Sequence, residues 1–237
     1  MATAVPQEKV NGLSTYLSII FAPREAFAQL ARTPMWGWAA LIGMILAVAA
    51  PIISLPEIQK IGDVARQQAL SQMSADQQAQ AQSAMAMSAH LTPIFATAGA
   101  AVFIWLFWLV TALIYLGAAA LTGGTATFGR AWVAVLNASI AYFVASLINA
   151  IILALRGPDA IGSAVDAYAL PSLAMIVHGG VKLVTFLYYT TNLGAIWGYI
   201  VSVIALEQML KMGRGASIAT VVVITLIATG LAVWGAR

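Results

Sequence analysis

Charged residues are scarce in this chain. Only 8% of its 237 residues are Asp, Glu, Lys or Arg, and 62% are hydrophobic, whereas a soluble domain carries about 25% charged residues. A chain so poor in charge cannot cover a surface that faces water. The composition therefore excludes an ordinary soluble domain. It predicts an all-α, polytopic membrane protein, because a helix satisfies its own backbone hydrogen bonds in lipid.

Cysteine is absent, and histidine occurs only at His90 and His178. The lack of cysteine excludes disulfides, cysteine-ligated metals and thiol catalysis. The sequence also lacks an H-E-x-x-H zinc motif, a G-x-S-x-G nucleophile motif and a phosphate-binding loop. We therefore assign no catalytic, metal-binding or cofactor-binding residue and predict that the protein is not an enzyme. The net charge of +3 is small, and we expect no nucleic-acid partner.

Long apolar segments dominate the rest of the chain. Five of them are long enough to cross a hydrocarbon core of about 30 Å, at a rise of about 1.5 Å per helical residue. They form a predicted five-span membrane domain over residues 35–237. Leu170–Val181 is also apolar but short, with an interfacial or a re-entrant helix as alternatives. The predicted spans are Trp36–Leu55, Thr92–Leu121, Ala131–Leu155, Lys182–Glu207 and Ala216–Trp234.

Residues 1–34 form a separate N-terminal region in this prediction. A polar tail precedes helical pieces over Leu13–Arg32. Pro23 suits the first turn of a helix, and Phe27 and Leu30 share one apolar face of it. We expect these helices to lie in the membrane interface. The alternative is a cap helix that packs on the bundle.

Residues 56–91 interrupt the apolar pattern with Gln, Ala, Ser and Met. Ser74 and Gln77 match a capping box, which marks the start of a helix. We predict an extracytoplasmic helical insert here, made of two helices that meet near Met73 or of one long bent helix. A disordered loop is the alternative.

Short basic turns predict the orientation. Arg130 lies in the turn after the second predicted span, and Lys211 and Arg214 lie in the turn after the fourth. Short loops that carry Lys and Arg stay in the cytoplasm. With five spans, the N-terminus is then cytoplasmic and the C-terminus extracytoplasmic.

The fourth predicted span contains two features suited to helix contact. Gly194 and Gly198 have the G-x-x-x-G spacing that lets two helix backbones approach closely in lipid. Thr190, Thr191 and Asn192 form a polar cluster just before them. We interpret these five residues as a helix-packing site. The alternative is a lipid-binding or partner-binding groove with the glycines as its floor.

Polar groups inside the predicted spans are amides and hydroxyls rather than acids. Asn137 and Asn149 lie in the third span, and we expect them to bond to neighbouring helices at about 0.6 kcal/mol per bond. Every Asp and Glu lies in a predicted loop or at a span end. Because ion-driven transporters usually keep ionisable groups within the membrane, the pattern disfavours transport of that kind.

Charged residues at the predicted span ends form two candidate contacts. His178 and Lys182 share a helix face by their spacing, near the acids of the preceding loop. With Arg156 they make up a candidate interfacial polar site for an ion pair or a lipid headgroup. The alternative is an interfacial anchor whose lysine reaches to water. At the other boundary, Glu207 and Lys211 have the spacing of a helical ion pair.

Two loose motifs resemble a known family. Ser18 to Pro34 reads S-x-I-x-x-P-R-E-A-F-x-x-L-x-x-x-P, and the fourth span contains a Trp, Val and Ala-Leu-Glu pattern. With the five-span topology, this is similar to the bacterial branch of the YIP family, the Rab/Ypt-interacting-protein relatives. The acidic D-L-Y-G-P segment of eukaryotic members is absent. The matching positions are Pro23, Phe27, Leu30, Pro34, Trp197 and Leu206.

The resemblance implies a non-enzymatic protein of a bacterial cytoplasmic (inner) membrane. Some bacterial members resemble accessory subunits of MacB-like ABC exporters that work with a periplasmic adaptor. The expected partners are then the lipid bilayer and other membrane proteins, such as an ABC permease and its adaptor. A homo-oligomer is a further assembly that the sequence allows. The alternative function is a small transporter or a lipid-binding membrane protein.

Overall fold

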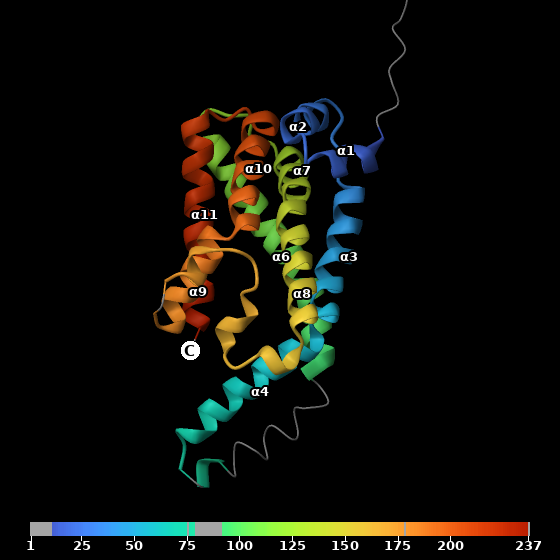
Figure 1. The fold of residues 1–237 in the computed structure, drawn as a ribbon. Helices are drawn as coiled ribbons and strands as arrows, with labels where there is room; N and C mark the ends of the chain where they lie inside the picture. The colour runs from blue at the N-terminus through green and yellow to red at the C-terminus, as the bar shows by residue number, and fades with distance from the viewer. Residues whose placement is uncertain (1–10, 75, 79–91, 178, 237) are drawn as a thin grey trace, which may run out of the picture.

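The computed structural model describes residues 11–74, 76–78, 92–177 and 179–236, and its regular elements in this part of the chain are helices. Most of them stand side by side in a bundle with α1 and α2 at one end, and α4 projects from the other end (Figure 1). The predicted all-α fold class is confirmed. The α-helices are α1 (Gly12–Ser18), α2 (Pro23–Arg32), α3 (Gly37–Ile53), α4 (Leu55–Ser71), α6 (Thr92–Leu121), α7 (Phe128–Ala138), α8 (Ile140–Arg156), α9 (Val181–Thr191), α10 (Leu193–Met209) and α11 (Arg214–Gly235).

The described residues contain three helical stretches long and apolar enough to cross a membrane: Val102–Leu121, Phe128–Arg156 and Arg214–Gly235. The number rises to five if the bent pairs α3–α4 and α9–α10 each form one span. The helix predicted over Thr92–Leu121 matches α6 residue for residue. The third predicted span corresponds to α7 and α8, which meet at Ser139.

α3 and α4 meet at an angle of 59°. Pro51 lies in the last turn of α3, where it removes one backbone donor. The Ser54 hydroxyl at the junction donates to the Ala50 carbonyl at 3.1 Å. Beyond the bend, the composition changes from apolar to charged, so α4 does not continue the span as an apolar helix. The charged residues of α4 are Glu57, Lys60, Asp63 and Arg66.

The segment predicted as one helix over Lys182–Glu207 is two helices, α9 and α10, bent by 48°. Asn192 separates them with φ −67° and ψ 149°. Its Oδ1 accepts from the Ala195 N–H and its Nδ2 donates to the Tyr188 carbonyl, both at 2.8 Å. One side chain therefore ends α9 and caps α10, a role for which Asn is well suited. Hydrophobicity alone does not predict this break, because the break is made by the hydrogen bonds of one capping side chain.

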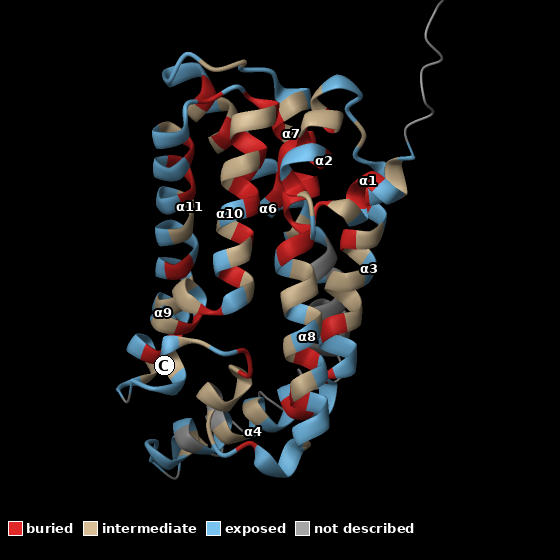
Figure 2. Ribbon diagram, turned by 45° about the horizontal axis from the view of Figure 1, so that its top comes forward, coloured by how far each residue is buried: buried red, intermediate tan, exposed pale blue. Residues whose placement is uncertain are grey.

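The main core lies where α2, α6, α7 and α10 meet, and the buried residues of α2, α7 and α10 gather there in Figure 2. Its largest fully buried side chain is Trp108 of α6. The indole Nε1 of Trp108 donates to the Ser139 hydroxyl at 2.9 Å, at the joint between α7 and α8. The Trp108 ring is therefore fully buried while its polar N–H group keeps a hydrogen-bond partner.

α2 turns its apolar face toward the protein. Phe27 and Leu30 are 0% and 1% exposed, and α2 packs chiefly on α10. Pro23 begins the helix, as predicted. The bundle covers the apolar face that was expected to face lipid, which favours the alternative of a packed cap helix. Placement of α2 in the membrane interface stays a prediction.

The predicted insert is only partly described. The capping box is confirmed: the Ser74 N–H donates to Gln77 Oε1 at 3.1 Å, and the Gln77 N–H donates to Ser74 Oγ at 3.5 Å. A second helix therefore begins after α4, near Met73 as predicted. Residues 79–91 and the tail over residues 1–10 lie outside the described residues.

The stretch between α8 and α9 is irregular. It contains three short 3-10 turns, η1 (Pro158–Ala160), η2 (Ala164–Ala167) and η3 (Leu173–Met175). The interfacial or re-entrant helix expected over Leu170–Val181 is not formed: among the described residues of that range, Leu173–Met175 form η3 and Val181 begins α9. The Leu173 N–H donates instead to the Thr191 hydroxyl at 2.9 Å. This tether holds the irregular stretch against the end of α9.

Candidate functional site

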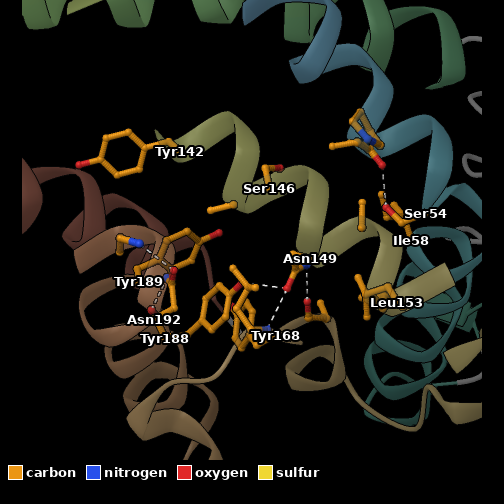
Figure 3. A pocket seen from close by; sticks show the side chains of 18 residues that line it. Ser54, Ile58, Tyr142, Ser146, Asn149, Leu153, Tyr168, Tyr188, Tyr189 and Asn192 are labelled. Atoms are coloured by element: carbon orange, nitrogen blue, oxygen red, sulfur yellow. Dashed lines mark hydrogen bonds between the residues drawn. The ribbon is translucent and has the colours of Figure 1, made fainter. Parts of the chain in front are cut away.

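An open cavity of about 450 Å³ lies between α8, the irregular stretch and the two helix breaks, at Ser54 and Asn192 (Figure 3). Amides, hydroxyls and tyrosines line it together with aliphatic side chains, and none of its described lining residues is charged. The non-helical backbone at both breaks therefore faces a cavity. Broken helices in membrane proteins are tolerated where they line such a space. The polar lining residues are Ser54, Tyr142, Ser146, Asn149, Tyr168, Tyr188, Tyr189 and Asn192.

Asn149 of α8 holds one wall of the cavity together. Its Oδ1 accepts from the Ala169 N–H at 2.9 Å, the Leu170 N–H at 3.2 Å and the Tyr188 hydroxyl at 2.9 Å. Its Nδ2 donates to the Ala167 carbonyl at 3.1 Å. The expectation that this amide bonds to a neighbouring helix holds for Tyr188 of α9. Its other partners belong to the irregular stretch, which sequence reasoning did not place there.

Tyr168 and Tyr188 form a stacked pair in the cavity wall, with ring centroids 4.3 Å apart. The Tyr168 hydroxyl lies 3.0 Å from the Thr185 hydroxyl, so the ring is held at its polar end as well. Tyr189 meets both rings edge-on. Sequence reasoning missed these tyrosines as a group. Tyr168 comes from the loop and the others from α9, and only the fold brings them together.

The polar cluster of Thr190, Thr191 and Asn192 does not bridge two bundle helices. The Thr190 and Thr191 hydroxyls donate to carbonyls one turn back in α9, at 2.7 Å and 2.6 Å. The hydroxyl of Thr191 also accepts from the loop, and Asn192 caps α10. The packing interpretation of these three residues is therefore corrected. They shape the end of α9, and Asn192 faces the cavity.

Gly194 and Gly198 do form a close helix contact. A Cβ at Gly198 would lie 2.5 Å from Cζ of Tyr142, and one at Gly194 would overlap Cβ of Ala145. Both neighbours belong to α8, so α10 and α8 approach closely through the glycines, as the G-x-x-x-G spacing predicts. Because α8 of the same chain covers this face, it is an internal packing face and not an open partner site.

A family model described as the Yip1 domain matches residues 17–236. The chain belongs to the Yip1 domain family. No curated protein and no solved structure matches it. The Yip1 match confirms the family resemblance seen in the sequence, while a bacterial origin stays a prediction.

The other candidate residues of this Yip1 domain lie apart from the cavity. Lys182 and Arg156 are exposed, and neither lines it; His178 lies outside the described residues. Asp166, a predicted neighbour of that group, accepts from the Gly162 and Ser163 backbone N–H groups at 2.9 Å and 2.7 Å. Asp166 thus stabilises its own loop, and the described residues contain no ion pair between it and Lys182.

The predicted ion pair of Glu207 with Lys211 is replaced by another. Glu207 Oε2 lies 3.4 Å from Arg24 Nη2, so it joins α10 to α2. Lys211 lies beyond the end of α10 with φ 54°, which takes its side chain off the helix face that the spacing assumed. The fold thus pairs residues that are far apart in the sequence.

The cavity of the Yip1 domain suits a neutral ligand better than a charged one. Its described walls offer hydroxyl and amide groups among aliphatic side chains and tyrosine rings. A charged ligand would find no countercharge there, and burying an unpaired charge is costly. No group of three or more His, Asp or Glu within reach of a metal ion occurs among the described residues.

Proposed function

We propose that this Yip1-domain protein is a non-enzymatic accessory subunit of a membrane complex and that it docks an extracytoplasmic partner on α4. The observation that carries the proposal is the position of α4. It leaves the bundle at the 59° bend and projects away from it (Figure 1). A charged helix held outside an apolar bundle has the surface of a docking element for a soluble partner.

The surface of α4 supports this role. It contacts α3, α8, η1 and η2, and Ile61 in its first half packs against Leu153, Ile161 and Ala169. Along the helix, Gln59, Lys60 and Gln67 are exposed. Leu55 and Ile58 add apolar surface, at 48% and 43% exposure. Mixed polar and apolar surface is typical of interfaces between separate proteins.

The specific form of the proposal is a subunit of an ABC exporter. The permease would contact the bundle within the membrane, and the extracytoplasmic adaptor would contact α4. This form rests on the resemblance of bacterial YIP members to such subunits.

Site-specific crosslinking in cells tests the docking. A photo-crosslinking amino acid at Gln59 or Gln67 should yield one discrete adduct, identified by mass spectrometry as an extracytoplasmic protein. The matched control is Arg32, which is exposed at the opposite end of the bundle. Adducts of equal yield at Arg32, or no adduct at either α4 position, would contradict the proposal.

A second function is favoured by the cavity: a small transporter or lipid-handling protein whose neutral ligand binds between the helix breaks. Ser146→Trp should fill the cavity, because Ser146 lines it from α8. The control is Ile148→Trp on the same helix, since Ile148 is 45% exposed and does not line the cavity. Native mass spectrometry should show a co-purified ligand lost in the first variant only. Purified protein without any bound ligand would argue against this second function.

A further inference from the structure

The cavity lies at the start of α10, and a second hollow lies toward the other end of this helix. It is a groove of about 520 Å³ between α10 and α11. Its walls are aliphatic for most of their length, and three charged side chains stand at one end. An apolar groove with a charged end has the polarity of a membrane lipid. The lining residues are Arg24, Tyr199, Ile200, Val203, Ile204, Glu207, Arg214, Ile218, Val221, Val222, Thr225 and Leu226.

The charged end carries two arginines and one acid. Arg24 reaches it from α2 and pairs with Glu207 of α10, but its side chain is 62% exposed while that of Glu207 is 15% exposed. Arg214, the first residue of α11, is exposed as well. The described salt bridges give Arg214 no acidic partner. The group therefore has a net charge of +1 and guanidinium donors that face solvent.

From these features we propose that the groove binds one anionic phospholipid. Its phosphate lies between Arg24 and Arg214, and an acyl chain lies between α10 and α11. Guanidinium groups match phosphate oxygens in geometry and charge. This site is separate from the cavity and from α4, so it does not depend on the function proposed above.

The length of the groove fits an acyl chain. From Arg214 to Leu226 along α11, the lining covers a rise of about 18 Å, at about 1.5 Å per residue. One leaflet contributes about half of the 30 Å hydrocarbon core, or about 15 Å. The arginines thus lie at headgroup level when the apolar walls lie within one leaflet. A soluble anion such as free phosphate would leave this apolar length uncovered.

Glu207 competes with the lipid for Arg24. The carboxylate of Glu207 accepts from Arg24 at 3.4 Å. A phosphate would face a like charge at that position. Removal of the carboxylate by Glu207→Gln therefore frees Arg24 and removes the repulsion. The geometry predicts that this change strengthens binding, whereas a change in either arginine weakens it.

The test is native mass spectrometry of the full chain in mild detergent. Phosphatidylglycerol is compared with phosphatidylcholine of the same acyl chains. We expect one tightly retained phosphatidylglycerol. Arg24→Gln with Arg214→Gln should lower its affinity roughly tenfold or more, as expected for lost charged hydrogen bonds. Glu207→Gln should raise it severalfold, and the control Arg32→Gln, exposed on the same helix as Arg24, should leave it unchanged.

The apolar half of the proposal has its own pair of variants. Val222→Trp fills the groove and should reduce retention without any change in charge. Val223→Trp is the control, because Val223 is exposed on α11 but does not line the groove. Equal retention of the two lipids, or weaker phosphatidylglycerol binding by Glu207→Gln, would overturn the proposal. If the double arginine variant does not fold, the gain expected from Glu207→Gln still decides the matter.

Discussion

Replacing Asn149 with alanine should release the irregular stretch from α8. Four hydrogen bonds end on this side chain: the Oδ1 accepts three, and the Nδ2 donates one. Alanine leaves the Ala169 and Leu170 N–H groups and the Tyr188 hydroxyl without this acceptor. At about 0.6 kcal/mol per side-chain bond in a membrane protein, the loss is at least about 2 kcal/mol. Stranded donors raise the expected loss toward about 4 kcal/mol.

Two measurements check this expectation. Unfolding of the purified protein by SDS in mixed micelles gives the change in the free energy of unfolding. Hydrogen exchange read by mass spectrometry gives the local effect, because the backbone amides of Ala169 and Leu170 lose their acceptor. A loss of about 1.4 kcal/mol of local protection corresponds to tenfold faster exchange. We expect at least this acceleration in peptides that cover residues 165–172.

Asn137→Ala is the matched control on α7. The Asn137 Nδ2 donates to the Met35 carbonyl at 3.0 Å and to the Val133 carbonyl at 2.9 Å. Its removal strands no backbone N–H group, so we expect a loss of about 1 kcal/mol and no change in exchange at residues 165–172. Asn149 does not hold the irregular stretch if Asn149→Ala costs no more than Asn137→Ala, or if exchange at Ala169 and Leu170 is unchanged.

Three other substitutions follow from the packing. Gly198→Leu should push α10 away from Tyr142 of α8 and destabilise the folded bundle by about 1–3 kcal/mol in SDS titration. Gly230→Leu is the control: no described atom lies within 4 Å of the added Cβ, so stability should change by less than about 0.5 kcal/mol. Tyr16→Phe should stabilise the protein by up to about 1 kcal/mol, because the buried Tyr16 hydroxyl has no hydrogen-bond partner among the described residues; a clear loss of stability would show that the hydroxyl is satisfied. Asn192→Ala should cost about 1 kcal/mol through the lost cap of α10 and speed amide exchange at Ala195, and unchanged exchange there would disprove the capping role.

The predictions that succeeded depended on local chemistry. α6 matches its predicted bounds because a thirty-residue apolar segment in lipid can satisfy its backbone N–H and C=O groups only within its own helix. Pro23 begins α2, and Ser74 and Gln77 form their capping box, because each signal acts within one turn of helix. The close helix contact at Gly194 and Gly198 could also be predicted, because the G-x-x-x-G spacing favours such a contact with any helix that lies opposite.

The predictions that failed needed a partner far along the chain. The spacing of Glu207 and Lys211 suggested a helical pair, but α10 ends before Lys211 and Arg24 arrives from α2. Thr190, Thr191 and Asn192 lay in a run that was predicted as one continuous helix, and the capping role of Asn192 became clear only with the break in place. The spacing of apolar residues does not predict a helix end that is set by contacts with another part of the chain.

Composition and local motifs alone predict that this protein lies in a membrane and is built of helices. A chain with so few charges must bury its backbone in helices, and its motifs place it in the Yip1 domain family. Which residues meet became visible with the fold. It brings a loop tyrosine, an amide of α8 and two helix breaks around one cavity, and it brings Arg24 and Arg214 to one end of a groove. The reason is physical: hydrophobicity and caps act over a few residues, whereas a site is made by side chains whose distance along the chain sets no limit on their distance in space.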